Sequence, residues 1–281
     1  VIVNRLWQWH FGNGLVRSAS DFGARGDAPT HPELLEYLTD RLLTYDGSLK
    51  RVQRDLLLTS TYRLSSDMSN SQMAANFEAD PANQWLWRFA RRPLDAESIR
   101  DGMLEISGEL DHAMPGPHPF PPVEKWDFTI HYPFHAQYDS SHRSVYLMVQ
   151  RARKHPYLSL FDGADPNLST AQRGITTTPT QALYLMNAPF VHERSLAVAR
   201  RVLREHSTNA ARVAWCIEAT TGRVATDEEL SAATEFLQTY SQRSLAAAPM
   251  PNPTGDSDYS EQAWAALARA LFVSNGYLFV D

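Results

Sequence analysis

The sequence of 281 residues contains a single cysteine, Cys216. One thiol excludes an internal disulfide, a zinc site built from several thiolates, and the CxxCH motif that attaches a c-type haem. Cys216 lies in the apolar stretch VAWCIEA, where a buried position on a helix is the expected role. The sequence also lacks a run of about eighteen apolar residues, so it predicts no membrane-spanning helix in this fragment.

A strong charge of either sign is missing as well. The chain has 26 basic and 32 acidic residues, a formal net charge of −6 and a pI near 5.9. Without a general basic field it is a poor candidate for binding nucleic acid. Because it also lacks a glycine-rich dinucleotide fingerprint and an HExxH motif, we expect no cofactor and no transition metal in this fragment.

The first residues carry neither an initiator methionine nor a signal-peptide pattern, so we expect a piece of a longer protein. Apolar residues recur at helical spacing through most of the sequence. Short alternating segments occur only at Trp85–Phe89 and Val145–Val149. The sequence therefore predicts a mainly α fold, an irregular multi-helix domain with a two- or three-stranded β element and long proline-rich loops.

Composition divides the chain into an N-terminal helical part (1–64), a central part with long loops and the β element (65–188), and a C-terminal helical part (189–281). All three could also form one compact domain. Helix boundaries are predicted by Gly12, which suits a helix C-terminus, and by capping patterns that begin at Thr30, Asp95, Thr178 and Thr226.

Four side chains with metal-ligand chemistry lie close together in the sequence at His131, His135, Asp139 and His142. On one helix their spacing would align them, but Pro133 interrupts such a helix. We therefore favour solvated or hydrogen-bonding loop histidines over a metal site. Asp162, Asp165 and Asn167 likewise resemble the opening of a calcium loop, but their spacing is not that of an EF-hand, and tight turns explain them better.

The stretch from Arg143 to Gln181 gathers arginine, aspartate and threonine around one loop that leads into a helix. Free N–H groups at a helix N-terminus and nearby arginines can hold an anion. Helix capping by Thr178 and Gln181, and neutralisation of the cations by aspartates, explain the same residues without a ligand. Any ligand or partner contact is expected here, at Arg143, Arg151, Asp162, Asp165, Arg173, Thr176, Thr177 and Gln181.

A second charged segment, RRPLDAESIRD, places Glu97 and Asp101 on one helical face with Arg100 nearby. Two carboxylates beside an arginine could act as an acid and a base. Ion pairing and favourable charge at a helix start account for them more simply, so we assign them no catalytic role.

Several long motifs occur in the order found in one known family: NRLWQWHFGNGLV, DFGARGDAPTHPELLEYL, TSTYR, RRPLDAESIRDGML, RSVYLMVQR, LFDGADPN, TTTPTQALYLMNAPFV and ALFVSNGYLFVD. The chain resembles a bacterial family of unknown function, abundant in planctomycetes, that lies C-terminal to a c-type cytochrome domain in large exported proteins. One departure is Gly276, where the family favours an acidic residue.

The resemblance implies an extracytoplasmic location, partners among the other domains of the same polypeptide, including a cytochrome-c-like domain, and haem elsewhere in the full-length protein. It assigns no enzymatic activity to any residue. Two functional hypotheses follow. The first is a noncatalytic structural or interaction module. The alternative is a hydrolase-like enzyme domain that acts on an anionic polysaccharide, with its site in the 143–181 region.

Overall fold

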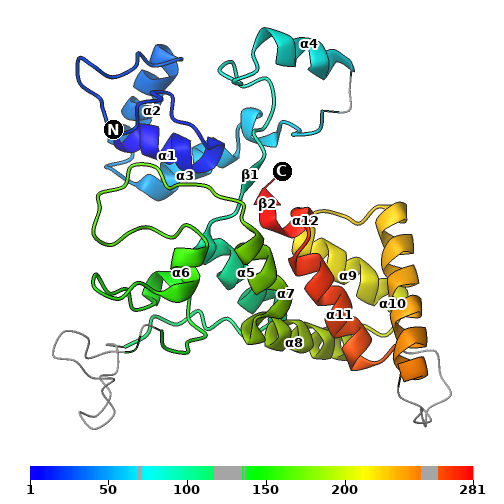
Figure 1. The fold of residues 1–281 in the computed structure, drawn as a ribbon. Coiled ribbons are helices and arrows are strands. Elements are labelled where there is room, and N and C mark those ends of the chain that lie inside the picture. The colour runs from blue at the N-terminus through cyan, green and yellow to red at the C-terminus, as the bar shows by residue number, and fades with distance from the viewer. Residues whose placement is uncertain (69–70, 117–134, 136, 248–258, 281) are drawn as a thin grey trace. The chain divides into compact units, whose positions relative to one another are not determined.

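The computed structural model describes residues 1–68, 71–116, 135, 137–247 and 259–280. These residues form a mainly α fold, as predicted, with one small two-stranded sheet (Figure 1). The chain divides into two compact units, one of residues 1–92 with Val280 and one of residues 93–279. The division into three parts, 1–64, 65–188 and 189–281, stays a prediction.

The described residues of the 1–92 unit form the α-helices α1 (Ile2–Phe11), α2 (Pro32–Thr44), α3 (Leu49–Leu57) and α4 (Ser71–Ala79), with a 3₁₀ turn η1 (Thr61–Arg63). Its core joins Leu6 and Trp7 of α1 to Leu38 of α2 and Val52 of α3. Helix α1 ends at Gly12, which has φ 85° and donates its N–H to Gln8 O. A glycine is suited to this left-handed conformation, and the predicted end of the first helix is confirmed.

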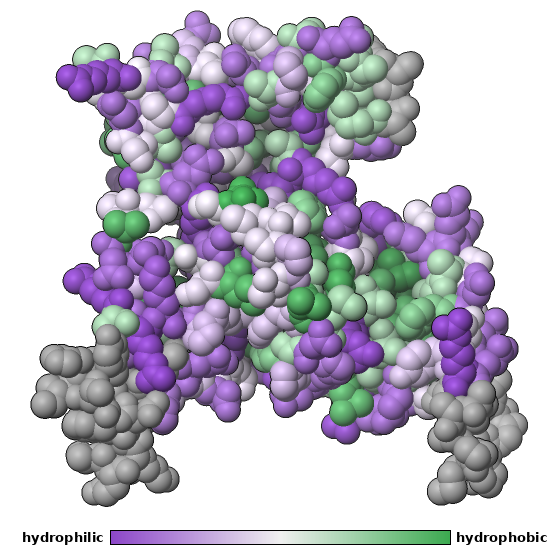
Figure 2. Space-filling model, viewed as in Figure 1, coloured by the Kyte–Doolittle hydropathy of each residue, from purple (hydrophilic) through white to green (hydrophobic). Residues whose placement is uncertain are grey.

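In the 93–279 unit the described helices are α5 (Ala96–Ser107), η3 (Ser144–Tyr146), α6 (Pro156–Leu160), α7 (Pro179–Asn187), α8 (Pro189–Glu205), α9 (Asn209–Thr221), α10 (Asp227–Ala247), α11 (Glu261–Phe272) and α12 (Asn275–Leu278). Helix α8 packs along α11, where Trp264 and Phe272 are fully buried. Hydrophilic side chains dominate the face seen in Figure 2, with hydrophobic ones in smaller groups. None of the described helices is long and apolar enough to cross a membrane.

Cys216 is buried in the same core on α9, as expected. Burial raises the pKa of its thiol to about 12. A thiol with so high a pKa has almost no thiolate at neutral pH, and only the thiolate is a good nucleophile. Cys216 therefore acts as a small packing residue.

Both predicted strands are wrong in position. The two described strands are β1 (Arg92–Pro93) and β2 (Phe279–Val280), which pair with each other. Residues 85–89 form a turn followed by irregular backbone, because the Asp80 carboxylate accepts from the N–H groups of Gln84 and Trp85, and Leu86 has φ 55°. Residues 144–146 form a 3₁₀ turn, so the alternation in Val145–Val149 reflects exposed positions on a loop.

Three of the four capping patterns are confirmed. Asp95 accepts from the N–H of Ser98 at the start of α5, while Thr178 and Thr226 each form a reciprocal capping box at the starts of α7 and α10. The Thr30 prediction is wrong, since α2 is preceded by His31 and the Thr30 hydroxyl donates to Leu15 O instead. The proline-rich stretches at 117–122 and 249–253 lie outside the described residues.

Candidate functional site

The predicted site begins at the N-terminus of α7. The N–H of Gln181 donates to Thr178 Oγ1 at 3.3 Å, and the N–H of Thr178 donates to Gln181 Oε1 at 2.9 Å. The Gln181 amide also donates from Nε2 to Leu160 O and to Thr176 Oγ1. Gln181 is buried, and its amide links the loop to the end of α6. Helix capping thus accounts for both Thr178 and Gln181.

We expect Thr178→Ala to lower the free energy of unfolding of the 93–279 unit by about 1 kcal/mol, because the cap and the reciprocal bond from Gln181 are both lost. Thr177→Ala is the matched control. Thr177 is the exposed neighbouring threonine, and in the described part of the chain its hydroxyl has no hydrogen bond. Urea unfolding of the two variants should differ by the cap alone, and equal midpoints would contradict the prediction.

Asp162 and Asp165 hold the loop between α6 and α7 in tight turns. Asp162 has φ 56°, and its carboxylate accepts from both the N–H and the hydroxyl of Thr176 at 2.7 Å. Asp165 accepts from the N–H of Asn167 and pairs with Lys154 Nζ at 2.8 Å. The hydrogen bond from Lys154 lowers the pKa of the Asp165 carboxyl. These contacts agree with the turn hypothesis, since each carboxylate accepts from backbone N–H groups of the loop itself.

Arg173 is engaged in a bidentate ion pair with Glu97 on α5. The two N···O distances are 2.6 and 3.0 Å, and the two side chains are 38% and 27% exposed. The hydrogen bond with Glu97 raises the pKa of the Arg173 guanidinium. The pair fastens residue 173 of the loop to a residue that lies 76 positions earlier in the sequence.

A pocket of about 290 Å³ lies beside these contacts, and it is lined by Asp162, Asp165 and Arg173 among the predicted residues. His155 lines the pocket as well. It is buried, and its Nδ1 accepts from the N–H of Leu158 at the start of α6. Burial, and then the positive charge of Arg100, lower the pKa of His155, so the ring is neutral at pH 7. Sequence reasoning missed His155 because its neighbours spell no motif.

The other predicted cations do not join this pocket. Arg143 points a guanidinium N–H toward His112 Nδ1 at 3.3 Å, and Arg151 is exposed, with its carbonyl accepting from the Asn167 amide. Neither residue lines the pocket, and neither does Thr177. The structure therefore brings Asp162, Thr176 and Gln181 together by hydrogen bonds and leaves Arg143, Arg151 and Thr177 apart from them.

Of the four residues considered as metal ligands, His135, Asp139 and His142 lie among the described residues, and His131 lies outside them. His142 Nδ1 lies 3.4 Å from Asp111 Oδ2, and the N–H of His135 donates to the Tyr138 hydroxyl. Within the described ranges no group of three or more histidine, cysteine, aspartate or glutamate side chains could hold a metal ion. The expectation of no metal site stays a prediction.

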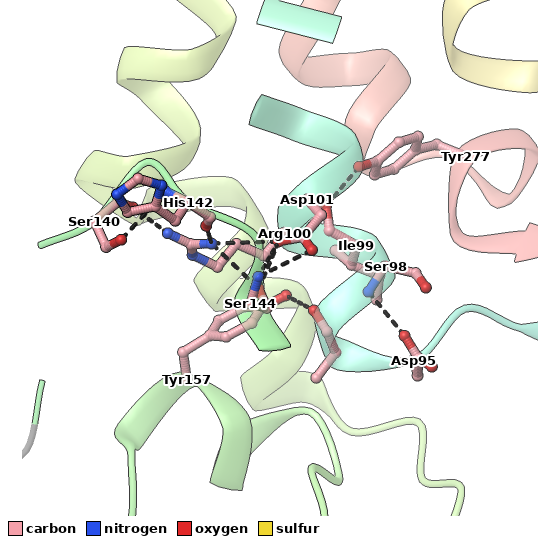
Figure 3. A network of polar contacts seen from close by, with 11 residues as sticks. Asp95, Ser98, Ile99, Arg100, Asp101, Ser140, His142, Ser144, Tyr157 and Tyr277 are labelled. Carbon is pink, nitrogen blue, oxygen red and sulfur yellow. Dashed lines mark hydrogen bonds and ion pairs between the residues drawn. The ribbon is translucent and has the colours of Figure 1, made fainter. Parts of the chain in front are cut away.

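A buried polar network on α5 goes beyond the ion pairing predicted for this segment, because it includes residues of loop 140–144 (Figure 3). The Arg100 guanidinium donates to the carbonyls of Ser140 and His142 and lies 3.3 Å from the Asp101 carboxylate. Asp101 in turn accepts from the N–H and the hydroxyl of Ser144. Arg100 is 7% exposed, and burial lowers the pKa of its guanidinium. The network fastens loop 140–144 to α5.

Helical periodicity carried a signal for Arg100. The residue lies four positions after Ala96 and three before Met103, and both of these are buried on the same face of α5. A charged residue within an apolar stripe of a helix needs polar partners from another segment. The ion pairing expected for this segment is present, but its partners in loop 140–144 could not be read from the motif itself.

Comparison with protein families gives a match over most of the chain. The family model PSD1, described as a protein of unknown function (DUF1553), matches residues 1–237. No curated protein and no solved structure is similar enough to match the chain. Because the match covers well over half of the sequence, the chain belongs to the PSD1 family of proteins of unknown function (DUF1553).

Proposed function

We propose that the chain is a noncatalytic interaction module of an extracytoplasmic, multidomain bacterial protein of planctomycete type. Its partners are the other domains of the same polypeptide, among them a cytochrome-c-like domain that carries haem outside this fragment. Support for these partners and for the location comes from the resemblance of the sequence motifs. Support for an interaction role comes from the loop between η3 and α7.

The observation that carries the proposal is the contrast between charged and apolar side chains in this loop. Its charged groups are largely satisfied within the chain, through Lys154 with Asp165, Arg173 with Glu97, and Asp162 with Thr176. Three of its large apolar side chains, Val149, Leu168 and Ile175, are exposed, as are Val145 and Tyr146 of η3, although Tyr157 and Leu158 of α6 are buried. Exposed apolar residues on a loop fixed at both ends favour contact with another protein surface.

The energetic argument favours a protein partner over a charged ligand. An anionic ligand at Arg173 would have to replace a bidentate carboxylate that is already in place, which leaves little net gain. Covering Leu168 and Ile175, which are 69% and 65% exposed, removes apolar surface from water at about 1.5 to 3 kcal/mol for each fully buried side chain. The apolar side chains therefore offer the larger driving force.

Titration calorimetry of the chain with the cytochrome-c-like domain tests the proposal. We expect a one-to-one complex that Leu168→Ser or Ile175→Ser weakens roughly tenfold, because each change removes an apolar contact from the interface. Leu43→Ser is the matched control, since Leu43 is equally exposed but lies on α2. Unchanged affinity in both loop variants would contradict the assigned surface, and the absence of any complex would contradict the partner.

Arg173→Ala separates a binding role from a structural one. Arg223 provides the matched control, because it also forms a bidentate pair, with Glu229 at 2.6 and 2.9 Å, far along the sequence from the loop. Both pairs are partly exposed, so each replacement should cost at most about 1 kcal/mol in the free energy of unfolding. We expect Arg173→Ala alone to weaken the complex, because it frees the loop from α5. Equal binding by the two variants would show that the Arg173 pair has no part in recognition.

The alternative function, a hydrolase-like enzyme for an anionic polysaccharide, is favoured only by the pocket that joins Asp162, Asp165 and Arg173. Two carboxylates at one pocket are the groups that glycoside hydrolysis requires. The chain should be incubated with sulfated and uronic-acid polysaccharides, and their length followed by size-exclusion chromatography. Depolymerisation that disappears in both Asp162→Asn and Asp165→Asn would replace the interaction hypothesis with the enzymatic one.

A further inference from the structure

A second pocket, of about 140 Å³, lies wholly within the 1–92 unit. Two aromatic rings of α1, Trp7 and Phe11, stack at a centroid distance of 4.0 Å and form part of its lining. Two arginines, Arg17 and Arg88, also line the pocket. Its lining includes no aspartate and no glutamate, in contrast to the pocket near α6.

Two turns, each held by hydrogen bonds of a buried asparagine side chain, place these arginines at the pocket. Asn4 is fully buried on α1, and its amide bonds both the carbonyl and the N–H of Val16, which fixes the turn before Arg17. Gly14 is required in this turn, because a Cβ there would lie 2.5 Å from Asn4 Nδ2. Asn83 is also buried, with φ 51°, and its Nδ2 donates to the carbonyl of Arg88 at 2.9 Å. The backbone on both sides of the pocket is therefore held in place.

Neither arginine has a counter-charge in the described part of the chain. Arg17 donates from one terminal nitrogen to Ala82 O at 3.1 Å, and the Arg88 guanidinium lies over the Trp87 ring, 5.2 Å from its centroid. The Nε atoms of both are buried without a hydrogen-bond partner. Asp80, the acidic residue of the nearby turn, already accepts from the N–H groups of Gln84 and Trp85.

This arrangement leaves two guanidinium groups partly stripped of water and uncompensated. A cation that loses part of its hydration without gaining an opposite charge is destabilising, and each missing hydrogen bond adds to the cost. An anion that enters the pocket would compensate the positive charge of both guanidinium groups and accept hydrogen bonds from them. An anion would gain more there than at an exposed arginine such as Arg54 on α3.

We propose that this pocket of the 1–92 unit binds a small oxyanion between the guanidinium groups of Arg17 and Arg88. The fork of N–H donors on each guanidinium matches the oxygens of a sulfate, phosphate or carboxylate group. The volume sets the size, since a cavity of about 150 Å³ holds a molecule no larger than benzene. The pocket therefore takes one anionic group, either a free ion or the charged group of a larger molecule whose remainder stays outside.

Titration calorimetry of the whole chain tests the site with sodium sulfate, phosphate and acetate at constant ionic strength in a chloride background. We expect one site with a dissociation constant of about 1 mM or lower for at least one of these ions. A parallel titration with a sulfated monosaccharide separates the two sources. Affinity equal to that for free sulfate indicates recognition of the charged group, and much weaker affinity restricts the site to the free ion.

Arg17→Gln and Arg88→Gln should each weaken anion binding roughly tenfold or more, because each removes a charged donor. Arg54→Gln is the matched control and should bind like the unaltered chain. Equal affinities in all three variants would overturn the proposal, as would an affinity in the unaltered chain no higher than that for chloride.

A second measurement covers the case in which the glutamine variants fail to fold. In the unaltered chain, the guanidinium Nε–H resonances of Arg17 and Arg88 should shift on addition of sulfate, while that of Arg54 stays in place. Arg17→Lys and Arg88→Lys keep the positive charge but lose the planar fork, so they should fold and bind more weakly. Resonances that do not move under saturating sulfate would overturn the site.

Discussion

Replacement of Arg100 by alanine is expected to lower the free energy of unfolding of the 93–279 unit by about 3 kcal/mol, near the lower end of the cost of breaking a buried ion pair. Arg100 is buried on α5, where it donates to two carbonyls of loop 140–144 and neighbours the Asp101 carboxylate. Without the guanidinium these carbonyls and the carboxylate lose their main cationic partner. Urea unfolding, together with hydrogen exchange at the N–H of Ser144, measures the effect.

Two control variants separate burial from charge. Arg204 also pairs with a glutamate, Glu205, but its side chain is 70% exposed, so Arg204→Ala should have little effect on the free energy of unfolding. Arg100→Lys keeps the charge, although an ammonium group cannot reach the same set of carbonyls in a fixed fork, and an intermediate cost is expected. If Arg100→Ala costs no more than Arg204→Ala, the network in Figure 3 does not support the loop.

Local sequence signals predicted the parts of the fold that depend on neighbouring residues. Gly12 ends α1, and the pairs at Thr178 with Gln181 and Thr226 with Glu229 cap their helices, because each interaction joins residues within one turn. Thr30 shows the limit of such patterns. Its spacing to Glu33 fits a capping box, but a carbonyl fifteen residues away, at Leu15, takes its hydroxyl instead.

Long-range pairing is the part that the sequence could not supply. Arg173 was a candidate for anion binding because it precedes a helix start, and nothing near it in the sequence identifies Glu97 as its partner. The predicted strands failed for a related reason. A strand needs a neighbouring strand, and alternation within 145–149 carries no information about whether one is present. Exposed apolar residues on a loop give the same pattern.

The same consideration explains why the pocket with Arg17 and Arg88 has no signature in the sequence. The two arginines are 71 positions apart, and each stands among ordinary loop residues. Only the folded chain shows that they share a pocket without a carboxylate, whereas Lys154 and Arg173 line a pocket together with Asp162 and Asp165. The number of charged residues in a segment is therefore a weaker guide to anion binding than the pairing state of each one.

The effect of Gly102→Ala on the free energy of unfolding is expected to depend on residue 277, destabilising the chain when that residue is tyrosine and stabilising it when it is phenylalanine. Alanine is favoured over glycine within a helix by about 1 kcal/mol, so the substitution on α5 would ordinarily stabilise the chain. Here a Cβ at residue 102 would lie 2.7 Å from the Tyr277 hydroxyl, which donates to Ile99 O at 2.6 Å. Tyr277 is buried and packs against Phe272, so it has little room to move. The clash and the lost hydrogen bond together should lower the free energy of unfolding by about 2 kcal/mol.

Tyr277→Phe removes the atom that causes the clash. The ring carbons Cζ and Cε2 would lie 3.5 Å from the new Cβ, which is ordinary van der Waals contact. Tyr277→Phe alone should cost about 1 kcal/mol for the hydrogen bond to Ile99 O, but Gly102→Ala added to it should recover up to about 1 kcal/mol. The double-mutant cycle, measured by urea unfolding, should therefore give a coupling energy of about 2 to 3 kcal/mol. Additive effects within about 0.5 kcal/mol would mean that the hydroxyl does not lie against residue 102, and the contact between α12 and α5 would have to be assigned to other atoms.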